Sequence, residues 1–304
     1  MPMEKPYDIV FDSGTGRPIL VSPGRRERPF NTRPGDDHRE LCPFCAGNEN
    51  LTPEESDSVR HDGSPPGTPG WTVRTFENLY PATARHEVIA EGAEHTIHPA
   101  ELGSGVLADS LAVYRRRILA AEERPEVECA FLFKNVGAAA GSSIAHNHSQ
   151  LLGLPMLPPR LVSELSNSTR SGCIHCREIA RAEAEGRVIH AGRHHVILSP
   201  STPKLPFEAW LVPLNHDDDF FADTHDDDLV DTLKSLYTDL DRAFDGAPFN
   251  TFLHRVPNAD FHWHIEIQPR VGQLAALELG GDMYINSVST HHSVQRWTGG
   301  RVDG

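Results

Sequence analysis

The chain has 304 residues, enough for two ordinary domains or one large domain with a full hydrophobic core. Its formal net charge of −15 argues against an extended nucleic-acid-binding surface, although an acidic protein can still carry a local cationic pocket for a nucleotide. No apolar run approaches the roughly 20 residues of a membrane span, and residues 1–6 lack the basic and apolar regions of a signal peptide. We therefore expect a cytoplasmic protein with no membrane or nucleic-acid partner.

The N-terminal region combines a short predicted strand with a cluster of basic side chains. Residues 18–21 are apolar and are followed by a Pro-Gly turn. Arg25, Arg26 and Arg28 come next, so three guanidinium groups fall within four residues. Such a cluster is suited to gripping the phosphates or the base of a nucleotide, and ordinary surface arginines are an equally good interpretation of the sequence.

Cysteine spacing predicts two metal sites. Four of the five cysteines occur as Cys-X-X-Cys pairs, Cys42/Cys45 and Cys173/Cys176, whereas Cys129 lies within an apolar run. In a reducing compartment, pairs at this spacing are far more often metal ligands than disulfides. We therefore assign both pairs to metal ions and Cys129 to the core.

Strands around one helix are predicted in the first half of the chain. The pattern of apolar residues predicts strands at residues 71–76 and 86–90, a helix at 105–123 and a strand at 129–134. A loop of small residues then leads into a further strand at 144–154.

Three prolines between residues 155 and 159 interrupt the chain, and we place a domain boundary between residues 158 and 159. The second half then repeats the plan of the first. Its predicted elements are strands at 195–198 and 207–212, a helix at 226–244 and a strand at 251–256.

Candidate metal ligands follow one another in the same order in the two halves. The first set is Cys42, Cys45, His95 and His146, and the second set is Cys173, Cys176, His216 and His262. Two thiolates with two imidazoles favour four-coordinate Zn²⁺ in closed, structural sites, with iron as an alternative in the second. His98 is the rival of His95, and His175 is expected to face solvent. The repeated order predicts an internal duplication. The expected fold class is α+β, with two tandem units at residues 1–158 and 159–304, each a mostly antiparallel sheet with a packed helix.

His148 is the candidate nucleophile. If His146 is bound to a metal, His148 remains available two residues later, on the same face of a strand as Gln150. The preceding loop offers bare backbone and hydroxyl groups to a phosphate, through Gly137, Gly141, Ser142 and Ser143. An imidazole that attacks the α-phosphorus of a nucleotide forms a covalent intermediate, and Gln150 can donate a hydrogen bond to the phosphate as its charge shifts.

The residue two positions after each candidate imidazole separates the two halves. Gln150 has no proton to give at ordinary pH, so we favour transfer with a phosphate leaving group over hydrolysis. In the second half, Glu266 follows His264, and a carboxylate at this place would repel a phosphate. We therefore expect catalysis in the first half and a structural role for the second.

Several motifs together resemble the galactose-1-phosphate uridylyltransferase family of the histidine triad superfamily, including its ADP-glucose phosphorylase branch. They are Ser-Pro-Gly-Arg-Arg-Glu-Arg-Pro at 22–29, Cys-Pro-Phe-Cys at 42–45, His-Asn-His-Ser-Gln at 146–150, His-Trp-His-Ile-Glu at 262–266 and Tyr-Ile-Asn at 284–286. The resemblance implies two histidine-triad-like units, catalytic in residues 1–158 and structural in 159–304, and a homodimer. It also implies that His148 carries the nucleotidyl group and that Gln150 holds its phosphate. The residues expected to bind substrate are Arg25, Arg28, Asn78, Asn135, Gly141, Ser142 and Ser143.

Three functions are consistent with these residues. The leading hypothesis is a ping-pong nucleotidyltransferase that moves an NMP, with UMP favoured, from a nucleoside diphosphate sugar to a sugar 1-phosphate. The second is a phosphorylase of the ADP-glucose type, in which inorganic phosphate is the acceptor. The third is a zinc-containing protein that binds nucleotides without turning them over.

Overall fold

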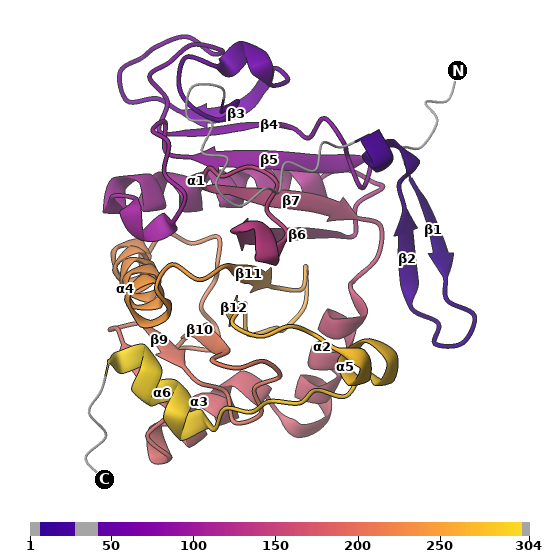
Figure 1. Ribbon diagram of the computed structural model, residues 1–304, viewed down its shortest axis with the longest axis vertical. Helices are drawn as coiled ribbons and strands as arrows, with labels where there is room; N and C mark the ends of the chain where they lie inside the picture. Colours follow the sequence, from indigo (N-terminus) through magenta and orange to yellow (C-terminus); the bar gives the residue numbers. More distant parts are fainter. Residues whose placement is uncertain (1–6, 28–41, 300–304) are drawn as a thin grey trace.

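Ten strands form one continuous antiparallel sheet in the computed structural model, which describes residues 7–27 and 42–299. The sheet runs through the whole height of the molecule (Figure 1). In spatial order its strands are β3 (Glu55–Val59), β4 (Val73–Glu77), β5 (Arg85–Glu91), β7 (His148–Leu154), β6 (Cys129–Val136), β11 (Phe249–His254), β12 (His264–Pro269), β10 (Ala209–Pro213), β9 (His195–Leu198) and β8 (Val188–Ala191).

The strand order is the same in both halves when each is followed inward from its edge. The first half contributes β3, β4, β5, β7 and β6, and the second contributes β8, β9, β10, β12 and β11. The halves meet where β6 pairs with β11, with Asn135 opposite Asn250. Thus β7 and β12 occupy corresponding positions. Each begins at the second histidine of a His-X-His motif.

Two long helices lie against one face of this sheet. Helix α1 (Ser104–Glu122) contacts β3 to β7, helix α4 (Asp226–Phe244) contacts β8 and β9, and the two helices contact each other. Their apolar stripes enclose the main core with the strands, through residues such as Leu111, Ile118 and Leu236. Both helices were predicted from the 3.6-residue periodicity, and both are confirmed within one residue.

The two faces of β7 have different surroundings. Leu151 belongs to the main core, and Ser149 Oγ lies 2.8 Å from the Tyr114 hydroxyl of α1, so this face meets the helices. Because successive side chains alternate, His148 and Gln150 point to the opposite face. The strand begins at His148 and not at Ile144 as predicted, because the backbone around His146 turns toward the metal ligands.

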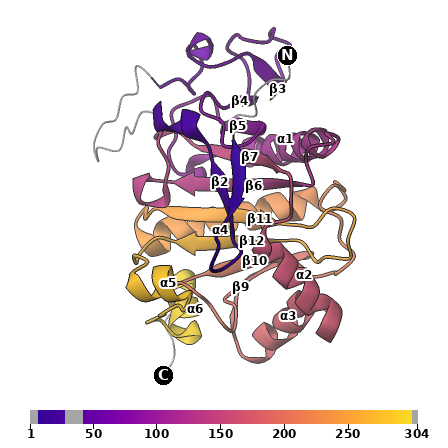
Figure 2. The ribbon, with the colours of Figure 1, turned by 90° about the vertical axis from the view of Figure 1, so that its right-hand side faces the viewer.

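Smaller elements surround the sheet. A separate hairpin of β1 (Asp8–Phe11) and β2 (Pro18–Val21) extends from one edge of the molecule (Figures 1 and 2). The short 3₁₀ helices are η1 (Pro23–Glu27), η3 (Glu49–Leu51), η4 (Pro99–Glu101) and η5 (Ala138–Ala140). The remaining helices are α2 (Pro159–Ser171), α3 (Ile174–Ala184), α5 (Ala276–Gly281) and α6 (Thr290–Thr298).

Helix α2 starts where the sequence predicted only a break. Pro159 occupies the first turn of this helix, where a missing N–H costs nothing, so the prolines end β7 without preventing a helix. The predicted boundary at residues 158 and 159 falls at the start of α2. The expected α+β class, with a large antiparallel sheet and packed helices, is confirmed. Within the described residues, no helix has the length and apolar character to cross a membrane.

Candidate active site and metal-ligand groups

Four side chains of the first half converge as predicted for a metal site. Cys42 and Cys45 come from the loop before η3, His95 follows β5, and His146 precedes β7. The Sγ atom of Cys45 lies 3.3 Å from His95 Nδ1 and 3.6 Å from His146 Nδ1. Burial lowers the pKa of His146 to about 4, so its imidazole is neutral, as a metal ligand must be.

The second half repeats this geometry. Cys176 Sγ lies 3.6 Å from His216 Nδ1 and 3.5 Å from His262 Nδ1, and Cys173 Sγ lies 3.5 Å from the same atom of His262. The other ring nitrogen of each of these histidines has a partner. His262 Nε2 is 2.9 Å from the Pro213 carbonyl oxygen, and His216 Nε2 is 2.6 Å from a carboxylate oxygen of Asp260.

Both groups have the dimensions of a four-coordinate zinc site. Bonds of about 2.3 Å to sulfur and about 2.1 Å to nitrogen, at tetrahedral angles, place S and N roughly 3.6 Å apart. The observed separations of 3.3 to 3.6 Å agree with this value. The expectation of two metal-ligand groups is therefore confirmed, with His95 and not its rival His98 in the first group.

His148 lies beside the first group and presents its ring to a cavity. Its Nδ1 donates to the backbone carbonyl of His146, at 2.7 Å, which fixes the tautomer and leaves the lone pair on Nε2. The ring of Phe44 packs edge-on against it, with the ring centres 5.2 Å apart. The metal-ligand group and the candidate nucleophile are thus linked through one short stretch of backbone.

The cavity that His148 lines has a volume of about 270 Å³. Its walls are mainly apolar and aromatic, as suits a nucleobase, with a few polar side chains among them. The apolar walls include Phe44, Leu51, Pro53, Phe76 and Val88. Of the predicted site residues, the cavity brings together Asn78, Ser143, His148 and Gln150.

Gln150 is held in one orientation by a residue that the sequence did not single out. Its Oε1 lies 2.9 Å from Nε2 of His86, a buried side chain on β5. Ala82 N–H donates to His86 Nδ1 at 3.0 Å, and Asn78 Nδ2 lies 3.2 Å from His86 Nε2. No single-sequence signal separated His86 from the other histidines of the chain.

The loop before His148 contains two glycines in a backbone conformation that favours glycine. Gly137 and Gly141 have φ angles of 80° and 92°, in the left-handed region that side chains avoid. Asn135 Oδ1 accepts a hydrogen bond from Asn250 of the second half, which also donates to the Ala140 carbonyl. Ser142 Oγ donates to the carbonyl of Ile144, at 2.9 Å. The second half therefore supports the loop of the first.

The arginine cluster is only partly within the described residues. Arg25 Nη1 donates to the backbone carbonyl of Tyr80, at 2.7 Å, and Tyr80 is one of the cavity residues. This contact brings η1 to the rim of the cavity. Arg28, the other predicted substrate-binding arginine, lies outside the described residues.

A buried polar network supports β7 from behind. Lys134 Nζ forms an ion pair with Glu91 and donates to Asn147 Oδ1 at 2.8 Å. Ser149 Oγ also donates to Glu91, at 2.6 Å. Burial lowers the pKa of Lys134, and the charge of Glu91 opposes that shift. These bonds fix the backbone between His146 and His148.

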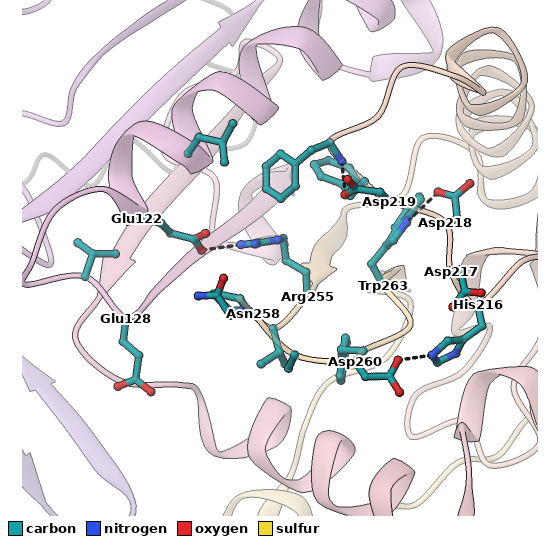
Figure 3. A pocket seen from close by; sticks show the side chains of 18 of the residues that line it. Glu122, Glu128, His216, Asp217, Asp218, Asp219, Arg255, Asn258, Asp260 and Trp263 are labelled. Atoms are coloured by element: carbon teal, nitrogen blue, oxygen red, sulfur yellow. Dashed lines mark hydrogen bonds and ion pairs between the residues drawn. The ribbon is translucent and has the colours of Figure 1, made fainter.

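A larger cavity lies between the C-terminal end of α1 and two loops of the second half, beside the second metal-ligand group. It has a volume of about 880 Å³ and is strongly acidic (Figure 3). Figure 3 shows two of its ion pairs, Glu122 with Arg255 and Asp260 with His216. Because Asp217, Asp218 and Asp219 also line it, this cavity repels phosphate, and the smaller cavity at His148 is the candidate active site.

Proteins of known activity match nearly the whole chain, although no model of a known protein family does. The chain is 28% identical to ADP-glucose phosphorylase of Arabidopsis thaliana, over 92% of this chain and 89% of that protein. It is 23% identical to galactose-1-phosphate uridylyltransferase of Thermotoga maritima, over 94% of this chain and 95% of that protein.

Its homologues are ADP-glucose phosphorylase and the galactose-1-phosphate uridylyltransferases.

Solved structures agree with this relationship. A crystal structure of an Arabidopsis thaliana ADP-glucose phosphorylase with bound ADP-glucose has a TM-score of 0.75 and 27% identity, and the match covers 97% of this chain and 100% of that one. A uridylyltransferase structure shares the fold, with a TM-score of 0.77, 24% identity and coverage of 97% and 98%. The resemblance carried by the motifs is therefore confirmed, and the chain has the fold of this family of nucleotidyltransferases and phosphorylases.

The position that corresponds to the active site in the second half is filled by side chains. His264 is buried, with Nδ1 3.3 Å from the His262 carbonyl, and Arg160 of α2 forms an ion pair with Glu266. His175, which was expected to face solvent, is 1% exposed and packs against His264 with ring centres 3.9 Å apart. That expectation was wrong because the Cys-X-X-Cys turn folds onto β12.

A further group of ligand-type side chains occurs in the same region. Glu164 of α2, His254 of β11 and His264 of β12 place their ligand atoms within 4.8 Å of one another. Burial alone would raise the pKa of Glu164, but the hydrogen bond from His254 and the charge of Arg160 lower it to about 2. The sequence analysis did not identify this group, because α2 was not predicted.

Proposed function

We propose that this protein cleaves a nucleoside diphosphate sugar by transferring the NMP to His148 Nε2. The observation that carries the proposal is the fixed His148 tautomer in the lining of a cavity that is also lined by Gln150 and Asn78. The homologues support it, since ADP-glucose phosphorylase and galactose-1-phosphate uridylyltransferase are both named for reactions of nucleotide sugars or sugar phosphates.

In the first step, His148 Nε2 attacks the α-phosphorus. An N–P bond forms, the P–O bond to the β-phosphate breaks, and sugar 1-phosphate leaves with that electron pair. The leaving group is already a stable anion, so no general acid is required. As the ring becomes positively charged, its Nδ1–H bond to the His146 carbonyl stabilises it, and the amide of Gln150 donates to the phosphate.

In the second step, a phosphate oxygen of the acceptor attacks the phosphorus of the nucleotidyl-histidine. A P–O bond forms, the P–N bond breaks, and His148 recovers its lone pair. With inorganic phosphate as acceptor the product is a nucleoside diphosphate, and the enzyme is a phosphorylase of the ADP-glucose type. We favour this acceptor because the phosphorylase relative is 28% identical over 92% of the chain.

Transfer of UMP to a sugar 1-phosphate, the leading expectation from the sequence, is the second candidate. It is supported by the Thermotoga maritima uridylyltransferase, whose 23% identity extends over 94% of the chain. The covalent step is the same for both acceptors. Non-catalytic nucleotide binding is the third candidate, and it predicts no covalent intermediate.

We further infer that both Cys₂His₂ groups hold Zn²⁺ as a structural ion. Thiolate and imidazole ligands at tetrahedral separations favour zinc. Cys42, Cys45, His95 and His146 would hold the first ion, which fixes the backbone next to His148. The second ion would fix the Cys173 turn against β12, where iron remains the alternative. Thiols kept for metal binding suit a cytoplasmic protein.

A homodimer is the proposed assembly, because two exposed apolar surfaces remain uncovered. The hairpin exposes side chains such as Phe11, at 59%, and Ile19, at 46%. The segment after α5 exposes Met283 and Ile285, at 62% and 66%. Apolar patches of this kind mark interaction surfaces in soluble proteins. Light scattering coupled to size exclusion should give twice the mass of the chain, and a monomer over the accessible concentration range would contradict this.

The test of the proposed chemistry uses ADP-glucose and UDP-glucose radiolabelled at the α-phosphate. Wild-type protein should acquire label that survives denaturation and alkali but is lost in acid, as expected for a phosphoramidate. His148→Asn should acquire none. Unlabelled wild-type protein with both nucleotide sugars would refute the covalent mechanism and leave non-catalytic binding as the better function.

A second experiment identifies the acceptor. Labelled wild-type protein, freed of substrate, is mixed with inorganic phosphate, glucose 1-phosphate or galactose 1-phosphate, and the labelled product is identified. Release of labelled nucleoside diphosphate by phosphate alone supports the phosphorylase. Release only by a sugar 1-phosphate supports the uridylyltransferase type of reaction.

A further inference from the structure

The environment of His86 determines where its proton lies. Nδ1 accepts the Ala82 N–H, at 3.0 Å, and therefore carries no proton. A neutral imidazole has one N–H group, which must then be on Nε2. That nitrogen is 2.9 Å from Gln150 Oε1, so His86 donates to the amide oxygen of Gln150. Asn78 Nδ2, 3.2 Å from the same nitrogen, is a donor as well and therefore makes no hydrogen bond to it, because Asn78 Oδ1 already accepts the Tyr80 N–H.

This hydrogen bond decides which end of the Gln150 amide meets the substrate. A glutamine amide can present either its oxygen or its NH₂ group, and only the NH₂ group donates to a phosphate oxygen. With Oε1 bonded to His86, Gln150 Nε2 is directed away from His86, and the side chain lines the cavity together with His148. A flipped amide would place an oxygen lone pair against the phosphate.

The matching position in the second half carries a different residue. Val88 of β5 lies opposite Gln150, and Trp210 lies opposite Glu266, so His86 and Glu208 occupy corresponding places two residues earlier. Glu208 accepts hydrogen bonds from the Lys204 and Leu205 backbone N–H groups. The half that has the cavity thus carries an imidazole N–H donor at this place, whereas the other half carries a carboxyl group.

We propose that His86 is a positioning residue for the nucleotidyl transfer, which orients the amide of Gln150 so that its NH₂ group donates to the transferred phosphate. This role rests on the proposed covalent chemistry at His148. His86 has no part in it as an acid or base, because its Nδ1 is occupied as an acceptor and its Nε2 proton is shared with an amide oxygen.

The test is a double-mutant cycle that measures the single-turnover rate of covalent labelling. The substrate is ADP-glucose or UDP-glucose labelled at the α-phosphate, whichever the wild-type protein prefers. His86→Met removes the donor with little change of volume and should lower the rate about tenfold. Gln150→Ala should lower it about 100-fold. The double variant should be no slower than Gln150→Ala, since His86 has then nothing to orient.

Conservative variants separate positioning from a general structural role. His86→Gln keeps an N–H donor near the place of Nε2 and should label within about threefold of wild type, whereas the shorter His86→Asn should resemble His86→Met. Binding of the unlabelled nucleotide sugar, measured by calorimetry in a His148→Asn background, should change less than about threefold with His86→Met. The matched control, Glu208→Gln in the second half, should label like wild type.

The outcomes distinguish the inference from the function on which it rests. Wild-type protein that takes no label overturns both. If wild type is labelled, three results overturn the role of His86 alone: additive losses in the double variant, a normal rate for His86→Met, or a slow His86→Gln with native thermal stability. If His86→Met fails to fold, the comparison of His86→Gln with His86→Asn decides in the same way.

Discussion

The two halves of the sheet have the same arrangement of strands but different surroundings for the second histidine of the His-X-His motif. In the first half, His148 has Phe44 on one side and a cavity of about 270 Å³ in front of it. In the second half, His264 has the same backbone partner two residues earlier, but His175 packs against it and its side chain is fully buried. The shared fold therefore supplies position, and the side chains around it decide between chemistry and packing.

Helix α2 accounts for much of this difference. Its Arg160 pairs with Glu266, and its Glu164 accepts from His254, at 3.0 Å, so the helix fills the space that substrate would need. Charge has the same effect, since Gln150 can donate to phosphate whereas Glu266 is an acceptor only. The proposed transfer needs a cavity, a hydrogen-bond donor to phosphate and an imidazole of fixed tautomer at one place. Of the two His-X-His motifs, only the one that ends at His148 combines all three.

The largest expected effect is the loss of covalent labelling on replacing one histidine and not the other. His148→Asn removes the nucleophile and should abolish labelling, whereas His264→Asn should retain a rate within about threefold of wild type. Because His264 is fully buried, its replacement should lower the free energy of unfolding by roughly 1–3 kcal/mol. The variant should therefore unfold at a lower temperature. Labelled bands after denaturing electrophoresis and thermal unfolding measure the two effects. Equal labelling of both variants would break the comparison.

The next effect concerns the residue two positions further along each strand. Gln150→Glu brings a carboxylate to the phosphate and should slow labelling by about 100- to 1,000-fold. Glu266→Gln leaves Arg160 with Glu164 as its remaining partner and should not change the rate, while lowering stability. Single-turnover rates and denaturant titrations measure the pair. A normal rate for Gln150→Glu would show that this side chain does not meet the phosphate.

Much of this comparison could be predicted from the sequence, because its signals are periodic or repeated. The two long helices follow from apolar stripes, and the ligand groups follow from Cys-X-X-Cys pairs with histidines in a repeated order. The candidate nucleophile His148 was distinguished from His264 by the contrast between Gln150 and Glu266. Each of these signals lies in local sequence and does not depend on how distant segments pack.

The remaining features depend on contacts between distant segments. Helix α2 begins with Pro159, so its start looks like a break, and the contacts of Arg160 and Glu164 with the second site could not be foreseen. His86 becomes significant only because β5 pairs with β7 and brings it to Gln150. The burial of His175 likewise comes from packing on β12. The supporting residue His86 was therefore missed, whereas the candidate nucleophile His148 could be proposed from the sequence and remains a prediction.

Removal of the two metal sites should have a moderate and unequal effect on activity. Cys42→Ala should lose one equivalent of metal and label about tenfold or more slowly, because His146 loses the ion that fixes the backbone beside His148. Cys173→Ala should also lose one equivalent but label within about threefold of wild type, with lower thermal stability. Elemental analysis and labelling of the folded fraction provide both measurements. Equal rate losses would mean that the two ions support the active site together.

The smallest expected effect is a pH dependence of stability that belongs to the second half alone. Burial and the neighbouring charge of Glu266 raise the pKa of Glu208 to about 7, above the 4.5 expected for an unfolded chain. Between these values the folded state keeps a proton that the unfolded state has lost, so this group's contribution to stability falls as the pH rises from about 4.5 to 7. His86, its counterpart in the first half, donates to the neutral amide of Gln150. Glu208→Gln should therefore gain thermal stability relative to wild type on going from pH 5 to pH 7, by about 5 °C.

Glu183→Gln, which removes an exposed carboxylate of α3, should follow wild type at both pH values. If the difference in thermal stability between Glu208→Gln and wild type is independent of pH, the Glu208 and Glu266 carboxyl groups do not share a proton. The contrast between His86 and Glu208 would then lie in side-chain shape alone.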